Sequence, residues 1–173
     1  MPTRILLADD HEIVRQGLRL LLQREGLEVI GEAANGQEAI RLASETCPDV
    51  AVLDYGMPLL NGIGAAREIM QVCPRTKVIL LTMHTDDHYV LEALRMGIKG
   101  FVVKSQAPAD LVRAIQEVQR GMVYLSPRVR VKLNEKIELR VGVQLPVVKS
   151  LNGDQDEKDT ERGREKLEPV LGQ

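Results

Sequence analysis

Short apolar runs alternate with longer amphipathic stretches through the first ~125 residues of the chain. Each run is about four residues long and hardly alternates in polarity, which is typical of parallel strands that are buried on both faces. We therefore predict five strands, at residues 5–8, 27–30, 50–53, 78–81 and 101–103.

The amphipathic segments between these runs have recognisable ends and predict five helices. Gly26 is a candidate stop for the first helix, because glycine adopts the left-handed backbone found after many helices. Asn61 is a candidate cap and Pro108 a favoured first-turn residue. The five helices are expected at about residues 12–25, 36–47, 62–73, 88–97 and 108–120.

Five strand–helix repeats in series imply right-handed crossovers and a parallel sheet covered on both faces. We therefore predict an α/β fold, a flavodoxin-like doubly wound sheet of five parallel strands in the order 2-1-3-4-5 with five helices. In such sheets the working site lies at the carboxyl ends of the strands, beside the point where the strand order reverses. Strands 1 and 3 flank that point.

The chain changes character after residue 125. Residues 126–150 mix Val and Leu with charged residues and are interpreted as a linker or short helical arm. Eleven of the seventeen residues in 152–168 are charged. Such a segment buries too little apolar surface to offset its ordering entropy, so we expect a disordered tail over residues 151–173. The predicted organisation is one domain over residues 1–125, followed by arm and tail.

Composition narrows the class of protein. The net charge of −2 and the isoelectric point near 6.0 argue against binding of nucleic acid by bulk electrostatics. No apolar run approaches the ~18 residues of a membrane span, and no signal peptide is evident, so we expect a cytoplasmic protein without a membrane anchor. Cys47 and Cys73 are too few for a disulfide framework or a zinc cluster, and we expect two reduced thiols.

Polar side chains follow four of the predicted strands. Asp9 and Asp10 follow the first strand, Asp54 the third, Thr82 the fourth and Lys104 the fifth. Alone, each is most simply a helix cap, a turn residue or a surface charge, but their coincidence at successive strand ends favours a site. Three neighbouring carboxylates repel one another unless a cation or proton joins them, and oxygen ligands fit Mg²⁺.

The segments that carry these residues resemble a response regulator receiver domain of two-component systems. They are LADDH (7–11), VLDYGMP (52–58), LLTMH (80–84) and GFVVKS (100–105). The stretch RGMVYLSP (120–127) and residues 81–84 resemble the NarL/FixJ subgroup in particular. The similarity covers about residues 3–127.

The resemblance implies a role for each matching residue. Asp54 would accept a phosphoryl group from a sensor histidine kinase or a small phosphodonor, forming an aspartyl-phosphate. Asp9, Asp10, Asp54 and the backbone carbonyl of Gly56 would bind Mg²⁺. Lys104 and Thr82 would contact phosphoryl oxygens of the modified Asp54.

The resemblance also implies a switch and three residues that modulate it. Thr82 would move toward the phosphoryl group, and the ring of Phe101 would rotate inward to fill the space. The alternative is that Phe101 is a core aromatic and nothing more. Gly56 (which offers no side chain to an attacking water), Met83 and His84 would influence the lifetime of the phosphorylated state.

The output of such a chain is harder to predict. NarL/FixJ regulators usually continue into a DNA-reading helix-turn-helix domain of roughly 60 residues, whereas 48 residues follow Leu125 here. We therefore predict no independent, sequence-specific DNA binding by this chain. A remnant of a truncated or frame-altered transcriptional regulator explains the tail equally well. A homodimer is possible, and the sequence does not choose its mode.

Three other functions compete with the receiver interpretation. A small-molecule aspartyl-phosphate phosphatase needs Asp-x-Asp after the first strand, whereas Asp9 and Asp10 are adjacent. A flavin or nucleotide binder needs a loop rich in Gly, Ser or Thr there, whereas the loop of this chain is acidic and would repel phosphate. A protein–protein interaction module that is never phosphorylated remains open. We expect no enzyme activity beyond Mg²⁺-dependent phosphorylation and dephosphorylation of Asp54 itself.

Overall fold

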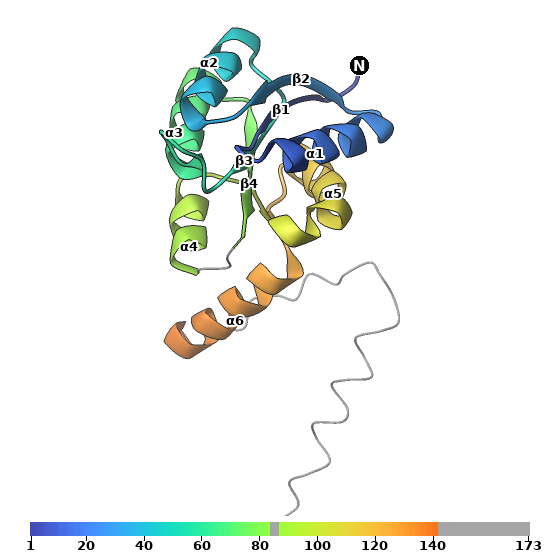
Figure 1. Cartoon of the computed structure of the whole chain (residues 1–173). Helices are drawn as coiled ribbons and strands as arrows, with labels where there is room; N and C mark the ends of the chain where they lie inside the picture. Colours follow the sequence, from blue (N-terminus) through green and yellow to red (C-terminus); the bar gives the residue numbers. More distant parts are fainter. Residues whose placement is uncertain (84–86, 142–173) are drawn as a thin grey trace, which may run out of the picture. The chain divides into compact units, whose positions relative to one another are not determined.

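The computed structural model describes residues 1–83 and 87–141. Within them the chain forms a six-stranded parallel sheet in the order β2-β1-β3-β4-β5-β6. Figure 1 shows the central strands between the helices. The strands are β1 Arg4–Ala8, β2 Glu28–Ala33, β3 Val50–Asp54, β4 Lys77–Thr82, β5 Gly100–Val103 and β6 Tyr124–Leu125. The helices are α1 Glu12–Arg24, α2 Gly36–Thr46, α3 Gly62–Val72, α4 Asp87–Arg95, the short 3₁₀ turn η1 Lys104–Gln106, α5 Ala107–Gln119 and α6 Pro127–Val141.

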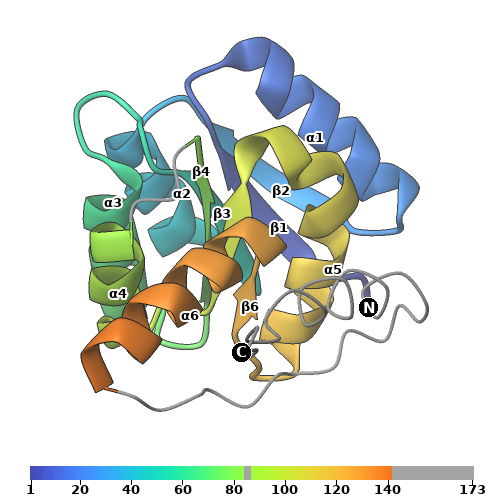
Figure 2. The ribbon, with the colours of Figure 1, turned by 90° about the horizontal axis from the view of Figure 1, so that it is seen from below.

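The helices cover both faces of the sheet. Helices α1 and α5 lie on one face, and α2, α3 and α4 lie on the other (Figure 2). Successive side chains of a strand point to opposite faces, so each central strand contributes to both cores. In β1, Ile5 and Leu7 pack toward α1 and α5, whereas Leu6 and Ala8 pack toward α2 and α3. This two-sided burial explains the unbroken apolar runs in the sequence.

The flavodoxin-like fold and the predicted order of the first five strands are confirmed. The predicted number of five helices is wrong, because α6 is a sixth α-helix within the described residues. The predicted number of strands is wrong as well, because β6 adds a sixth strand beside β5. It pairs through the N–H of Tyr124 with the carbonyl of Lys99 at 2.8 Å and the N–H of Ser126 with the carbonyl of Phe101 at 2.8 Å. A two-residue strand has no periodicity to detect. The edge strand β2 is also longer than the strand predicted at residues 27–30, and it is more exposed than a strand buried on both faces.

Side-chain caps fix the starts of the helices that flank β3. Asn35 accepts a hydrogen bond from the N–H of Glu38 at 2.9 Å, and Glu38 accepts one in return from the N–H of Ala34 at 3.0 Å. The first bond satisfies one of the N–H groups that every helix start leaves free, and the second ties down the residue before the cap. Asn61 accepts from the N–H of Gly64 at 2.8 Å, as predicted for a cap. After the C-terminal end of α1, Gly26 has the positive φ of 78° that is expected for a helix stop.

Helix α6 continues the domain beyond β6. Val129 and Leu133 are buried on the face of the sheet that α4 also covers. The helix lies within residues 126–150, which were predicted to form a linker or a short helical arm. The remainder of that segment and the predicted tail lie outside the described residues, as does His84. None of the described helices combines the length and the apolar character needed to cross a membrane.

The expectation of two reduced cysteines is wrong for this structure, in which Cys47 and Cys73 form a disulfide. Cys47 is the C-terminal cap of α2, in the short connection to β3, and Cys73 is the C-terminal cap of α3, in the short connection to β4. Because α2 and α3 pack side by side, these helix ends meet with a Cα–Cα distance of 5.6 Å, which is within the range that a disulfide spans. A sequence separation of 26 residues gave no sign of this proximity.

The disulfide generates a prediction about stability. Closing a loop of this length restricts the unfolded chain and is worth about 3.5 kcal/mol in the chain-entropy account. We expect a thiol reductant to lower the unfolding free energy of the native protein by about that amount. Urea denaturation with and without reductant measures it. Cys47→Ser replaces the more exposed cysteine, and its stability should not respond to reductant. Free thiols in the native protein purified without reductant would contradict the prediction.

Candidate functional site

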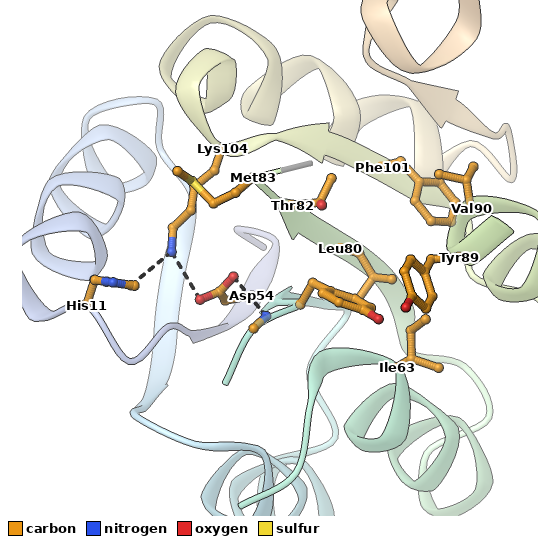
Figure 3. A pocket seen from close by; sticks show the side chains of 12 residues that line it. His11, Asp54, Ile63, Leu80, Thr82, Met83, Tyr89, Val90, Phe101 and Lys104 are labelled. Atoms are coloured by element: carbon orange, nitrogen blue, oxygen red, sulfur yellow. Dashed lines mark hydrogen bonds and ion pairs between the residues drawn. The ribbon is translucent and has the colours of Figure 1, made fainter. Parts of the chain in front are cut away.

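Four strand ends bring the polar site residues together at one edge of the sheet. Asp9 directly follows β1, Asp54 ends β3, Thr82 ends β4, and Lys104 directly follows β5. Parallel strands end at the same edge, so residues up to 95 positions apart become neighbours without any special loop. Figure 3 shows Lys104 reaching across this edge toward Asp54 and His11.

The ammonium group of Lys104 lies between two buried carboxylates. Its Nζ is 2.8 Å from Oδ2 of Asp9 and 3.0 Å from Oδ2 of Asp54. The exposed fractions of the three residues are 8%, 0% and 3%, respectively, so water screens these charges little. Removing Lys104 would therefore leave two buried carboxylates without a counter-charge.

The backbone around Asp9 fixes the carboxylate in place. Its Oδ1 accepts a hydrogen bond from the N–H of His11 at 2.8 Å. Its own N–H donates to the carbonyl of Ala33 at 3.0 Å, and its carbonyl accepts from Nη1 of Arg15 at 2.6 Å. Asp10 is more exposed, with 31% of its side chain accessible. The first acid of the pair is therefore held rigidly and the second faces solvent.

Burial and neighbouring charges shift two pKa values in the site. Burial raises the pKa of Asp54, the hydrogen bond from Lys104 lowers it, and the charge of Asp9 raises it, with a net increase. Burial lowers the pKa of Lys104, but the hydrogen bonds that its ammonium donates to Asp9 and Asp54 outweigh that effect and raise the pKa overall. Lys104 therefore stays charged, while the ionised form of Asp54 is disfavoured.

The acidic residues are suited to a divalent cation. One potential ligand atom from each of Asp9, Asp10, His11 and Asp54 lies within 4.8 Å of the others. Three ionised carboxylates and one ammonium group leave a net charge of −2 at the site, which a divalent cation balances. Carboxylate oxygens are the ligands that hard cations such as Mg²⁺ prefer. The side chains present therefore fit the cation that the sequence predicts.

A cavity of about 420 Å³ extends from the acidic residues toward α4. Asp54 and Lys104 line its polar end, and Val90 and Phe101 line its apolar end. Thr82 lies between the two ends (Figure 3). Phe101 is buried at 2% exposure and packs in the core beneath α4.

The structure brings the predicted site residues to one place. Asp9, Asp10, Asp54 and Lys104 form the charged cluster, and Gly56 donates its N–H to Oδ1 of Asp54 at 3.3 Å. The remaining predicted residues that the structure describes, Thr82, Met83 and Phe101, line the cavity.

Two features of the site were not predicted. His11 contributes its ring to the charged cluster; its place directly after the acid pair was the available signal. The rings of Tyr55 and Tyr89 also line the cavity, with their centroids 5.2 Å apart. Tyr55 follows Asp54 directly, whereas Tyr89 belongs to α4, so this pair connects the acidic residues to that helix.

Close packing around the backbone of Asp54 requires a glycine at the start of α3. A Cβ built on Gly62 would lie 2.5 Å from the carbonyl oxygen of Asp54 and 3.0 Å from Cα of Tyr55. The N–H of Gly62 also donates to the carbonyl of Tyr55 at 3.0 Å. The loop after β3 therefore returns directly over the acid that the sequence places at the centre of the site.

Comparisons with known proteins agree with this site. Residues 5–116 match the response regulator receiver domain family. The chain is 40% identical over 124 residues to the "Uncharacterized transcriptional regulatory protein YhcZ" of Bacillus subtilis, a match that covers 71% of this chain and 58% of the relative. The chain spans about three fifths of the length of the curated relatives it matches.

Solved structures give the same result. A LuxR-family two-component response regulator from Aurantimonas is 40% identical, with a TM-score of 0.75 over 79% of this chain and 98% of that one. The CheX–CheY–BeF₃–Mg²⁺ complex from Borrelia burgdorferi contains a chain that is 28% identical. Its TM-score is 0.65, and the match covers 68% of this chain and 90% of that one.

The packing of Gly62 against Asp54 generates a mutational prediction. Gly62→Ala forces a methyl group against backbone, and we expect it to lower the unfolding free energy by about 1–3 kcal/mol. Gly17→Ala is the matched control, because Gly17 lies in exposed α1 with no heavy atom near the added Cβ. That change should raise stability by about 0.5–1 kcal/mol. Equal effects in urea denaturation would contradict the packing argument.

The raised pKa of Asp54 predicts how stability depends on pH. Since the folded-state pKa lies above the unfolded value, the folded state loses stability as pH rises through the folded pKa. We expect Asp54→Asn to remove this loss and unfold at a higher temperature than the native protein at pH 7 without divalent cation. Each unit of pKa shift corresponds to about 1.4 kcal/mol.

Two conditions check the origin of that effect by thermal denaturation. The advantage of Asp54→Asn should shrink as pH falls toward 4, where the native carboxyl becomes protonated as well. It should also shrink in millimolar Mg²⁺, since a cation that binds the folded native protein stabilises it. An advantage that is the same at every pH would contradict the prediction.

Proposed function

The chain belongs to the response regulator receiver family, and from that premise we propose that it accepts a phosphoryl group on Asp54 in an Mg²⁺-dependent reaction. The observation that carries the proposal is the convergence of Asp9, Asp54 and Lys104 within 3.0 Å contacts at one sheet edge. An ionised carboxylate oxygen of Asp54 attacks the phosphorus of the donor, a P–O or P–N bond to the leaving group breaks, and an acyl phosphate forms.

The side chains around Asp54 support each part of this reaction. Asp9, Asp10, Asp54 and the carbonyl of Gly56 would hold Mg²⁺, as the acidic ligand set favours. Bound there, the cation offsets negative charge on the transferring phosphoryl oxygens. Support for Mg²⁺ also comes from the 28% identical CheY complex, whose name includes both BeF₃ and Mg²⁺.

Lys104 exchanges partners in the proposed reaction. Its ammonium now contacts the carboxylates of Asp9 and Asp54, and it would pair with a phosphoryl oxygen once Asp54 is modified. Thr82 would donate a hydrogen bond to another phosphoryl oxygen. Both residues line the cavity that reaches Phe101, so a shift of Thr82 would open space for that ring. The new charge-assisted bonds would bias two arrangements of β4, α4 and β5.

The lifetime of the modified state depends on residues near the acyl phosphate. Gly56 places no side chain beside the phosphoryl group, so attacking water meets little obstruction from that position. Met83 is exposed at the mouth of the cavity and would partly cover the group. We propose the same kind of influence for His84, which lies outside the described residues. The chain would act only on itself, gaining and losing the phosphoryl group of Asp54.

The partners follow from the same proposal. A sensor histidine kinase would donate the phosphoryl group, and the altered β4–α4–β5 surface would bind an output partner or a second copy of the chain. Relatives named as transcriptional regulatory proteins support control of transcription as the output.

Intact-mass spectrometry tests the phosphoryl acceptor. Incubation with Mg²⁺ and acetyl phosphate or phosphoramidate should add the mass of one phosphoryl group to the native protein and none to Asp54→Ala. Glu45→Ala, which removes an exposed acid from α2, should be modified like the native protein. Replacing Mg²⁺ with a chelator should abolish the mass gain.

Two outcomes would overturn the proposal. No mass gain in the native protein with either donor would favour an interaction module that is never phosphorylated. A mass gain that persists in Asp54→Ala would move the acceptor to another residue.

A further inference from the structure

The imidazole ring of His11 is part of the acidic site. Its Nδ1 lies 3.1 Å from Oδ1 of Asp10 and 3.2 Å from Oδ1 of Asp9. The same nitrogen lies 3.2 Å from Nζ of Lys104 (Figure 3). The ring therefore faces the point around which the carboxylates converge.

The fold does not need this side chain. His11 occupies the cap position of α1, but its ring makes no capping hydrogen bond, and its backbone N–H makes the contact with Asp9 instead. The side chain is 65% exposed, so its removal costs little burial. A change at this position thus tests the site without disturbing the helix.

The neighbours of Nδ1 make incompatible demands on it. The carboxylate oxygens of Asp9 and Asp10 accept hydrogen bonds and would need a proton on Nδ1, whereas the ammonium of Lys104 donates and needs a lone pair there. A cation between the ring and the acids would remove this conflict. It would bind the lone pair of Nδ1 and the carboxylate oxygens at the same time, and the ring proton would then be on the outward Nε2.

A nitrogen ligand changes which cation the site prefers. Mg²⁺ favours oxygen ligands, while imidazole suits first-row transition metals, whose affinities rise from Mn²⁺ through Co²⁺. We propose that His11 Nδ1 is a metal ligand that raises the affinity of the acidic site for Mn²⁺ and Co²⁺ relative to Mg²⁺. The inference rests on the proposed function, since it concerns the cation that would serve phosphoryl transfer.

The competing role for His11 is that of a counter-ion. A protonated imidazolium would offset the charge of the acids and compete with any entering cation. Its removal would then tighten the binding of Mg²⁺, Mn²⁺ and Co²⁺ alike. The two roles therefore predict opposite changes in affinity for transition metals.

Calorimetric titration with each cation separates these roles. In His11→Ala we expect the affinity for Mn²⁺ and Co²⁺ to fall by about tenfold or more, as measured losses of metal-site partners indicate, and the affinity for Mg²⁺ to change less than about twofold. His88→Ala is the matched control, because it removes an exposed imidazole of α4 that is not in the cluster. Its affinities should equal those of the native protein.

Proton NMR of the Co²⁺-loaded protein gives a second readout. A coordinated imidazole shows a strongly shifted, exchangeable ring N–H signal, which should occur in the native protein and His88→Ala but not in His11→Ala. Absence of that signal from the native protein would overturn the inference, as would equal or increased affinities for all three cations in His11→Ala.

The experiment keeps the two proposals apart. If none of the three cations binds the native protein, the Mg²⁺-dependent function fails and the role of His11 fails with it. If Mg²⁺ binds and supports modification of Asp54 but His11→Ala does not change the preference among cations, the role of His11 alone fails.

Discussion

The ammonium group between Asp9 and Asp54 is the interaction on which the site depends. Without Lys104, two buried carboxylates would face each other with only partial support from backbone N–H groups. The repulsion between those carboxylates constrains where β1, β3 and β5 end. A shift of one residue in any of these strands would move its charged side chain away from the others. The strand ends thereby create a net negative charge that a divalent cation would balance. In this way the fold itself provides the cation site that the proposed chemistry needs.

The sequence predicted the features that follow from strand order. Buried apolar runs identify the central strands, and the carboxyl ends of neighbouring parallel strands lie side by side, so the proximity of Asp9 and Asp54 was predictable. The Cys47–Cys73 bond was not, because it depends on how closely two helix ends approach. The direction of an exposed ring such as that of His11 was not either, since neither burial nor periodicity constrains it. The strand β6 was too short to produce a pattern.

The cavity beside Asp54 joins two environments that proteins usually keep apart. Its charged end interacts favourably with groups that form hydrogen bonds. Its apolar end, near Val90 and Phe101, interacts favourably with aromatic and aliphatic groups. A side chain such as Thr82, with one hydroxyl and one methyl group, suits the boundary between them. In the proposed mechanism a change of charge at one end therefore alters packing at the other, beneath α4.

The disulfide closes a covalent loop around one part of the domain. Asp54 lies within the covalent loop that Cys47 and Cys73 close, together with α3 and the turn that contacts its backbone. Thr82, α4, Phe101 and Lys104 all lie outside that loop. In the oxidised protein the phosphoryl acceptor would be anchored while the elements that respond to it shift independently, so motion would be directed to one side of the molecule.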